Sequence, residues 1–312
     1  MITSRMRQMA SRARRLVGHV LGRPPVSPAD PLAAFERYRE SATASGLSGL
    51  TLFLSFDCDT DWDFEVVEPL DSFLAERSIA VTYAVPGAQL ERGRDYYKAV
   101  AARGREFLNH GARPHAEWRQ DQDQYVPITF YQEMSSEQVS ADIRCGHQIV
   151  QDVTGQRAVG FRAPHFGSFQ GADDLALIYR TIEDLGYVYA STTVPEKGLN
   201  HGPAYRNGGI MELPTFGSAR APLNILDTWT HLTDRRRYAL GETYYELFVE
   251  TLDVLTHNHI PALLTWYGDP SHAWQQTAFM KAMDLIASRG IPSVSGREAA
   301  TFFGAAPSAP AL

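Results

Sequence analysis

Three carboxylates stand at alternate positions after an apolar run near residue 50. The segment Leu50–Phe56 is typical of a buried strand, and Asp57, Asp59 and Asp61 follow it directly. Alternate side chains of an extended backbone point to the same side, so the three carboxylates would face one space. Like charges this close are unfavourable unless a cation or an arginine offsets them. The pattern predicts a cation site or, as the alternative, a group of helix caps and turn residues.

Two histidines follow a second short strand-like run. Glu106–Asn109 leads into His110, and His115 stands five positions further along. Two imidazoles about one helical turn apart can bind one metal ion, with Asp59 as third ligand and water in an open fourth position. A His/His/Asp site with an open position is an arrangement that activates water for hydrolysis. We therefore predict a hydrolytic metal centre.

Further polar residues follow the later strand-like runs. Arg162 could offset the charge of the clustered carboxylates. The turn at Pro164 would direct the backbone N–H of His165 toward the same space. Asp269 and His272, which come after the last long strand-like run, supply a second ionisable group opposite the first.

Strand-like and helix-like segments alternate from Leu50 onward. The expected strands are Leu50–Phe56, Ile79–Val85, Glu106–Asn109, Ala158–Phe161, Tyr187–Ala190, Ile210–Leu213, Ala262–Trp266 and Pro292–Val294. The expected helices are Pro69–Arg77, Asp95–Arg103, Ser136–Val153, Asp173–Leu185, Glu242–His257 and Gln276–Ser288. Repeated strand–helix units predict a parallel α/β fold, and their number favours a closed or nearly closed barrel over an open doubly wound sheet. Either architecture places the chemistry at the carboxyl ends of the strands.

Composition restricts the class of protein. The chain has 312 residues, of which 44% are hydrophobic and 21% charged, as in globular proteins with a substantial core. Its net charge of -7 argues against binding of nucleic acid. The two cysteines, Cys58 and Cys145, are too far apart in the sequence for a CxxC metal motif, so we expect free thiols in a reducing compartment.

The first 30 residues differ in charge from the rest of the chain. Six arginines and no acidic residue precede Asp30, and apolar residues recur between them at helical spacing. This predicts a basic amphipathic helix over residues 1–23, which either docks on an anionic membrane or extends unpacked from the domain. Four prolines between residues 24 and 31 predict a linker. We expect an extension and linker over residues 1–47, a catalytic domain over 48–303 and a flexible tail over 304–312.

The ordered set of motifs resembles that of the NodB-homology polysaccharide deacetylases, the fourth carbohydrate esterase family, over about residues 48–303. Five short motifs occur in the family's order, which is more specific than any one of them. The resemblance implies a distorted (β/α)7-type barrel that uses a divalent metal to remove acetyl groups from sugars. It also implies that Asp57 is the general base and Asp59 a metal ligand, in the variant in which Cys58 separates the two.

The resemblance implies a ligand role for two histidines. His110 matches the family's first metal histidine. Pro114 stands where the second is expected and cannot bind a metal, so either His115 takes the role through a distorted turn or another group replaces it. The implied ion is Zn²⁺, and Co²⁺, Ni²⁺, Fe²⁺ or Mn²⁺ also suit such ligands.

Two further motifs imply catalytic roles. Arg162 matches the arginine that orients the base, and the backbone N–H of His165 would stabilise the oxyanion. The fifth motif departs most from the family pattern, because Asp269 and His272 stand near the usual position. We assign the general acid to His272 rather than Asp269, because an imidazole titrating near neutrality can protonate a leaving amine.

A group of residues is expected to bind the substrate. The resemblance implies that Asp227, which matches the family's fourth motif, pairs with Arg162, and that Trp229 of the same motif forms a wall of the acetyl pocket. Aromatic side chains in the long loops could stack on sugar rings, although several would be ordinary packing residues. The complete expected substrate-binding set is Trp62, Pro164, His165, Asp227, Trp229 and Trp266.

These observations predict a metal-dependent hydrolase that removes an acetyl group, N-acetyl in the first instance, from a sugar or glycan precursor. The alternatives are a metal-poor amidase acting on a small non-sugar amide and a catalytically dead carbohydrate-binding protein. The expected partner is an acetylated sugar, nucleotide-sugar or lipid-linked glycan, and no nucleic acid. Because no secretion signal is visible, we expect a cytoplasmic protein, with peripheral contact to the inner membrane face through residues 1–23.

Overall fold

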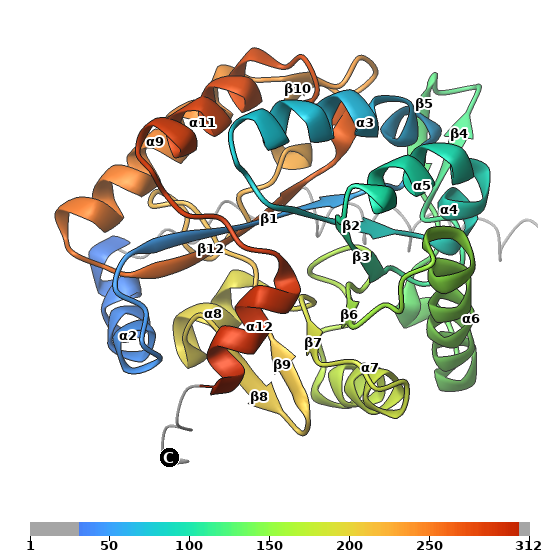
Figure 1. Ribbon diagram of the computed structural model, residues 1–312, viewed down its shortest axis with the longest axis horizontal. Helices are drawn as coiled ribbons and strands as arrows, with labels where there is room; N and C mark the ends of the chain where they lie inside the picture. The colour runs from blue at the N-terminus through green and yellow to red at the C-terminus, as the bar shows by residue number, and fades with distance from the viewer. Residues whose placement is uncertain (1–30, 306–312) are drawn as a thin grey trace, which may run out of the picture.

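A curled eight-stranded sheet organises the chain (Figure 1). The computed structural model describes residues 31–305. In sheet order the strands are β12 (Ala262–Gly268), β1 (Leu50–Asp57), β2 (Val81–Val85), β3 (Glu106–Asn109), β6 (Gly160–Phe161), β7 (Tyr189–Ala190), β9 (Ile210–Glu212) and β8 (Tyr205–Asn207). Neighbours from β12 to β9 pair in parallel, and β8 adds an antiparallel edge. Within residues 31–305 the sheet forms a half-barrel, which matches the distorted NodB-like (β/α) barrel that the sequence predicts.

Most helices lie along the outer face of this sheet, whereas α12 (Gly296–Ala305) packs with side chains of the sheet's inner face (Figure 1). The others are α2 (Pro31–Ala44), α3 (Asp61–Glu76), α4 (Gly87–Arg92), α5 (Arg94–Ala102), α6 (Ser136–Thr154), α7 (Ala172–Asp184), α8 (Pro195–His201), α9 (Glu242–His257), α10 (Pro270–Ala273) and α11 (Thr277–Ser288). Helix α12 contacts β7 and β9, and its buried side chains pack in a small core with Phe53 of β1. No helix in the described ranges is long and apolar enough to span a membrane.

Short elements between the helices surround the carboxyl ends of the strands. They are the hairpin of β4 (Ala116–Arg119) and β5 (Gln124–Pro127), the hairpin of β10 (Leu232–Asp234) and β11 (Ala239–Leu240), and the single turns η1 (Tyr131–Glu133) and η2 (Trp229–His231). These elements belong to the long loops that connect β3 to α6 and β9 to α9.

Side-chain alternation along β1 separates the core from the site. Leu52, Leu54 and Phe56 pack in the main core, which also contains the buried faces of the helices. Phe53 points the other way, into a smaller core that includes residues of α12. The next two positions on the Phe53 side are Ser55 and Asp57, so the inner face becomes polar at the carboxyl end of the strand.

Helix α3 begins eight residues earlier than the sequence analysis predicts. Pro69 is not its first residue but lies inside it. Thr60 and Asp63 form a capping box that starts the helix, and acidic side chains in the first turn favour its N-terminus. Asp61 therefore belongs to a helix and pairs with Arg92, so the prediction that it faces the same space as Asp57 and Asp59 is wrong.

Helix α2 packs on the domain instead of forming part of a linker. Pro31 is its first residue, a position that suits proline because no backbone N–H is needed there. Phe35 and Tyr38 are buried in the main core, and the Tyr38 hydroxyl contacts the main chain of Leu263 in β12. The packed fold thus includes residues 31–47, which the sequence analysis assigns to the linker. The predicted helix at residues 1–23 lies outside the described residues.

Candidate active site

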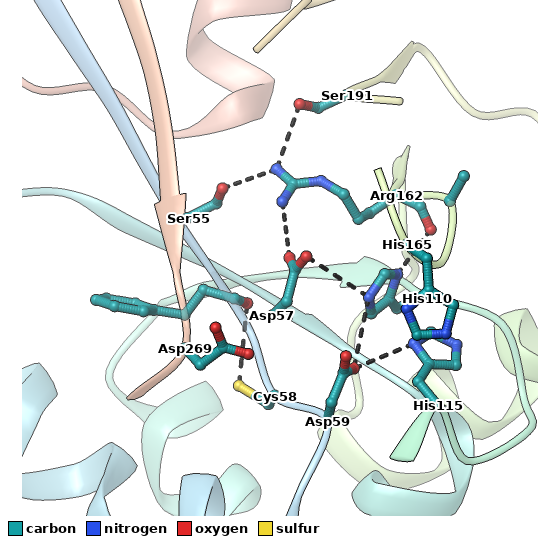
Figure 2. Close-up of polar contacts among 12 residues, drawn as sticks. Ser55, Asp57, Cys58, Asp59, His110, His115, Arg162, His165, Ser191 and Asp269 are labelled. Atoms are coloured by element: carbon teal, nitrogen blue, oxygen red, sulfur yellow. Dashed lines mark hydrogen bonds and ion pairs between the residues drawn. The ribbon is translucent and has the colours of Figure 1, made fainter. Parts of the chain in front are cut away.

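Asp59, His110 and His115 converge at the carboxyl ends of β1 and β3 (Figure 2). One possible ligand atom of each lies within 4.8 Å of those of the other two. His115 Nδ1 is 3.1 Å from Asp59 Oδ1, and His110 Nε2 is 3.6 Å from the same oxygen. Burial acts to raise the pKa of Asp59, but the two histidines outweigh it and hold that pKa well below its usual range. The five-residue histidine spacing therefore does not prevent convergence.

A glycine turn makes this convergence possible. Gly111 follows His110 with a φ of +78°, and a Cβ there would lie 2.4 Å from a carboxylate oxygen of Asp142. Glycine alone accepts both the backbone conformation and the close approach. The chain turns at this point, passes through Pro114 and returns the buried His115 ring to face His110, with ring centroids 4.3 Å apart.

The buried histidines present ring nitrogens without partners. His110 Nδ1 donates to the main-chain carbonyl of Arg162 at 2.8 Å, which fixes the ring and leaves Nε2 available. Nε2 of His110 and Nε2 of His115 are both buried and make no hydrogen bond within the described part of the chain. Burial lowers the pKa of His110, which keeps the imidazole in the neutral form that binds metals. These residues therefore fit a divalent metal ion of the zinc type.

A buried arginine holds Asp57 beside this cluster (Figure 2). Arg162 donates to Asp57 Oδ1 at 2.7 Å, to Ser55 Oγ at 2.7 Å and to Ser191 Oγ at 3.3 Å. The second carboxylate oxygen, Oδ2, lies 3.8 Å from His110 Nε2. Burial raises the pKa of Asp57 to about 8, and Arg162 opposes that rise. A carboxylate with a pKa near neutrality and one oxygen free of the arginine is suited to accept a proton.

Asp269 and His272 face the cluster as a pair. Asp269 Oδ2 lies 2.9 Å from His272 Nδ1, and Thr228 Oγ1 is 3.4 Å from each of them. Burial raises the pKa of Asp269 well above its usual value and lowers that of His272 to about 4. A proton held between the two therefore resides toward Asp269. The sequence analysis sets these residues in competition, whereas the structure joins them.

Aromatic side chains extend from His272 toward solvent. The Trp229 ring centroid is 5.7 Å from that of His272, and the Tyr238 ring centroid is 4.1 Å from it. Tyr238 in turn contacts Trp62 at 4.9 Å. Trp62 completes a cluster whose outer members are Trp118 and Tyr125 of the β4–β5 hairpin. Of the predicted substrate-binding residues, Trp229 thus lies beside His272, and Trp62 is connected to His272 through Tyr238.

His165 occupies a backbone conformation that is uncommon outside glycine. Its φ is +53°, and its carbonyl accepts hydrogen bonds from both the backbone N–H and the hydroxyl of Ser168, which hold the turn after the buried Pro164. The His165 ring centroid is 5.7 Å from that of His115. The residue therefore borders the cluster (Figure 2), while the role of its N–H as an oxyanion donor stays a prediction.

Two predictions about the substrate-binding set are wrong: the pairing of Asp227 with Arg162 and the access of Trp266 to the site. Asp227 does not pair with Arg162: its carboxylate accepts from the backbone N–H and hydroxyl of Thr230 at 2.7 and 3.0 Å, because the chain turns into η2 at this point. Trp266 is fully buried against Phe248 on the outer face of β12. Alternation instead directs Tyr267 inward, where the Arg162 guanidinium lies 5.4 Å from its ring centroid.

The sequence analysis assigns no site role to Ser55 or Ser191. Alternation two positions before Asp57 could have indicated Ser55. Nothing local indicates Ser191, which follows a two-residue strand. Both hydroxyls anchor the guanidinium that holds Asp57.

The fold and the site together define a class, an α/β half-barrel of the NodB type with a His/His/Asp cluster and a buried Asp–Arg pair at its strand ends. The family model for polysaccharide deacetylases matches residues 46–188. This segment contains Asp57, the three clustered residues and Arg162, and it ends before Asp269 and His272. No curated protein matches the chain.

Solved structures share the fold. A Mycobacterium smegmatis protein assigned to the polysaccharide deacetylases has a TM-score of 0.61 at 16% identity, covering 93% of this chain and 99% of its own. Another from Pseudomonas aeruginosa PAO1 has a TM-score of 0.57 at 14% identity, covering 88% and 94%. Puue allantoinase has a TM-score of 0.58 at 13% identity, covering 90% and 95%. At these identities the similarity concerns the fold alone.

Proposed function

We propose that this protein is a metal-dependent hydrolase that removes an N-acetyl group from a sugar or glycan precursor. The observation that carries the proposal is the His/His/Asp cluster beside the buried Asp57–Arg162 pair. The family match over residues 46–188 supports a deacetylase. The Asp57-Cys58-Asp59 segment would be a variant of the family's first motif, because Cys58 is buried while Asp57 and Asp59 both approach His110.

Asp59, His110 and His115 would hold the metal, with Zn²⁺ expected and Co²⁺, Ni²⁺, Fe²⁺ or Mn²⁺ compatible with the same donors. When bound, such an ion polarises the acetyl carbonyl and lowers the pKa of a water molecule.

The protein's own groups would move the protons. Asp57 accepts the water proton at Oδ2, because Oδ1 is bonded to Arg162. The backbone N–H of His165 stabilises the charge that develops on the acetyl oxygen. His272 Nε2 donates a proton to the leaving nitrogen, while the proton at Asp269 Oδ2 passes to His272 Nδ1. The amide bond breaks, acetate and a free amine leave, and the Asp269–His272 pair is one proton poorer until Asp57 or solvent returns it.

We further propose that the acetylated sugar carries a phosphate, as in a nucleotide-sugar or a lipid-linked glycan. Arg235, Arg236 and Arg237 are exposed in the β10–β11 hairpin, whose Tyr238 contacts His272. The Arg235 guanidinium lies 4.9 Å from the Trp229 ring centroid. Arginine forks suit phosphate oxygens, so the hairpin would pair with a phosphate while Trp229 contacts the sugar.

The test measures zinc content and acetate release for the purified chain. Substrates are a neutral N-acetyl sugar, its 1-phosphate, a nucleoside-diphosphate sugar and a polyprenyl-phosphate sugar. We expect release from the phosphorylated substrates to be the more efficient, and Arg236→Gln/Arg237→Gln to remove that advantage. Arg39→Gln/Arg180→Gln, a double change of exposed arginines on α2 and α7, is the matched control.

The two alternatives predict different results in the same assay. A metal-poor amidase would keep its turnover after chelation of zinc. A catalytically dead carbohydrate-binding protein would bind the sugars and release no acetate. Either result would overturn the proposed function.

We propose a cytoplasmic location with peripheral membrane contact through residues 1–23, on the basis of six arginines unaccompanied by acidic residues. Deletion of residues 1–23 should leave turnover of a soluble substrate unchanged and reduce co-sedimentation with anionic vesicles. Equal sedimentation of both chains, or equal binding to neutral vesicles, would contradict this contact.

A further inference from the structure

We propose that Asp63 is a positioning residue that fixes the turn carrying Asp59 and the helix carrying His272 relative to each other. Asp63 lies in the first turn of α3 and is fully buried. It belongs to neither the ligand cluster nor the Asp269–His272 pair. Its place in the reaction rests on the proposed function, whereas its geometry does not.

The two carboxylate oxygens of Asp63 serve different segments. Oδ2 accepts from the backbone N–H of Thr60 at 2.8 Å and from its hydroxyl at 2.7 Å. Oδ1 accepts from the backbone N–H of Ser271 at 3.0 Å and from its hydroxyl at 2.6 Å. One side chain thereby joins segments more than 200 positions apart in the sequence.

The bonded residues are the immediate neighbours of the proposed ligand and acid. Thr60 follows Asp59, and Ser271 precedes His272. The carbonyl of Asp59 also accepts from the side chain of Gln89 at 3.1 Å, so the turn is held on two sides. A shift of either segment would change the distance between the metal cluster and the acid.

Helix α10 depends on such contacts for its position. It has four residues, too few to be stable on its own, and it packs against α3. Asp63 supplies an acceptor for an N–H in its first turn, where a helix leaves donors unsatisfied. Burial raises the pKa of Asp63 to about 6, so the side chain is ionised at neutral pH and can accept all four bonds.

The experiment compares Asp63→Asn with two variants that each remove one hydroxyl, Ser271→Ala and Thr60→Ala. An asparagine keeps the shape, but its amide nitrogen cannot accept from either segment. For Asp63→Asn we expect kcat on an amide substrate to fall about 10- to 100-fold with little change in KM, because small displacements of catalytic groups cost that much. We also expect weaker zinc binding and shifted ring signals of His272 in NMR spectra.

The two hydroxyl variants should distinguish the effect of Asp63 on the His272 segment from its effect on the Asp59 segment. Ser271→Ala should shift the His272 signals and lower kcat at unchanged zinc affinity, and Thr60→Ala should weaken zinc binding with the His272 signals unchanged. Asp174→Asn is the matched control, because Asp174 occupies the same position in the capping box of α7, away from the site. It should alter none of the three readouts.

A lower melting temperature for Asp63→Asn together with wild-type kcat, zinc affinity and His272 signals would reduce Asp63 to a helix cap and overturn the proposal. If Asp63→Asn fails to fold, the hydroxyl variants carry the test, and wild-type behaviour of both would overturn it. Absence of acetate release from the wild-type chain would refute the proposed function instead. Zinc binding and the His272 signals would still test the positioning role.

Discussion

The two halves of the site are built in different ways. Asp57, the His/His/Asp cluster and Arg162 follow parallel strands or the glycine turn after one, and their mutual hydrogen bonds are buried inside the half-barrel. Asp269 and His272 stand on a one-turn helix, and Trp229 on a 3₁₀ turn, both outside the sheet. Within this second half, the Thr228 hydroxyl accepts from the backbone N–H of Asp269, and Asp63 of α3 ties the half to the rest by accepting from Ser271.

This difference in construction indicates which half of the site is rigid. Sheet register fixes the strand-end half, since β1 pairs with β12 over residues 50–56 and with β2 over residues 54–57, up to and including Asp57. The loop half is fixed by a few individual side chains, so single substitutions can displace it while the sheet remains intact. Substitutions in the two halves should therefore have distinguishable effects.

The largest effect is expected from removing a ligand. Asp59→Ala and His110→Ala should abolish both bound zinc and acetate release, because a cluster of three protein ligands loses one donor. The fold should persist, since neither side chain belongs to the hydrophobic core. Metal analysis, acetate assays and circular dichroism measure the three outcomes. Full zinc occupancy in either variant would remove that residue from the ligand set.

The next largest effect is expected at Asp57. Asp57→Asn should retain zinc and lower kcat by about 10²- to 10⁴-fold, the usual contribution of a positioned base. Arg162 would still donate to the amide oxygen, so the strand-end half should keep its geometry. Unchanged turnover would show that another group accepts the proton. Loss of zinc would show instead that Asp57 belongs to the ligand cluster.

Much of the fold could be predicted from the sequence because the apolar runs are long and periodic. The predicted ranges of α9 and β3 agree with the observed ranges at both ends. Errors occur where a local signal competes with a stronger one, as at Pro69, where the capping box at Thr60 sets the start of α3. The sequence does not predict helix α2, because the four prolines at residues 24–31 indicate a linker and the contact of Tyr38 with β12 is visible only in the fold.

The site could be predicted where a residue ends a strand, as Asp57 does, or follows one directly, as His110 does. It could not be predicted where long-range contacts decide. Asp227 and Thr230 form a local turn that competes with the expected pairing to Arg162. The Asp269–His272 contact depends on how the chain turns into α10. An aromatic residue type does not by itself show which of two neighbours faces the site: Trp266 is fully buried in the core, and Tyr267 lies beside Arg162.

A smaller effect is expected from Asp269→Asn, which tests whether the loop half acts as a pair. The pair holds one proton, mainly on Asp269, and Asp269→Asn leaves only His272, whose pKa burial lowers to about 4. The substitution therefore lowers the pKa at which the acid loses its proton. Because the acid must be protonated to act, activity falls as pH rises through that pKa. The basic limb of the pH profile should therefore move to lower pH, with amide turnover at neutral pH reduced about tenfold or more.

Substrates with different leaving groups show whether Asp269 and His272 donate one shared proton or act separately. His272→Ala should slow amides strongly and activated aryl acetates little, because only a poor leaving group needs protonation. Asp269→Asn should show the same dependence if the two residues share one proton. Equal slowing of amides and aryl acetates by Asp269→Asn would restrict that residue to positioning His272.

The smallest effect is expected from Trp229→Ala, which compares an aromatic side chain of the loop half with one on the sheet. Trp229 borders His272 and is partly exposed, so its loss should raise KM about 2- to 10-fold at nearly constant kcat, as expected for an aromatic contact of about 0.5–1.5 kcal/mol. Trp266→Ala should leave KM unchanged and lower the free energy of unfolding by about 3–5 kcal/mol, because that side chain is fully buried. Trp266→Phe retains most of the packing and serves as the control where the alanine variant does not fold. The measurements are steady-state kinetics and denaturant titrations on all three variants. A raised KM in Trp266→Phe, or an unchanged KM in Trp229→Ala, would contradict the assignment of the substrate contact to the loop half.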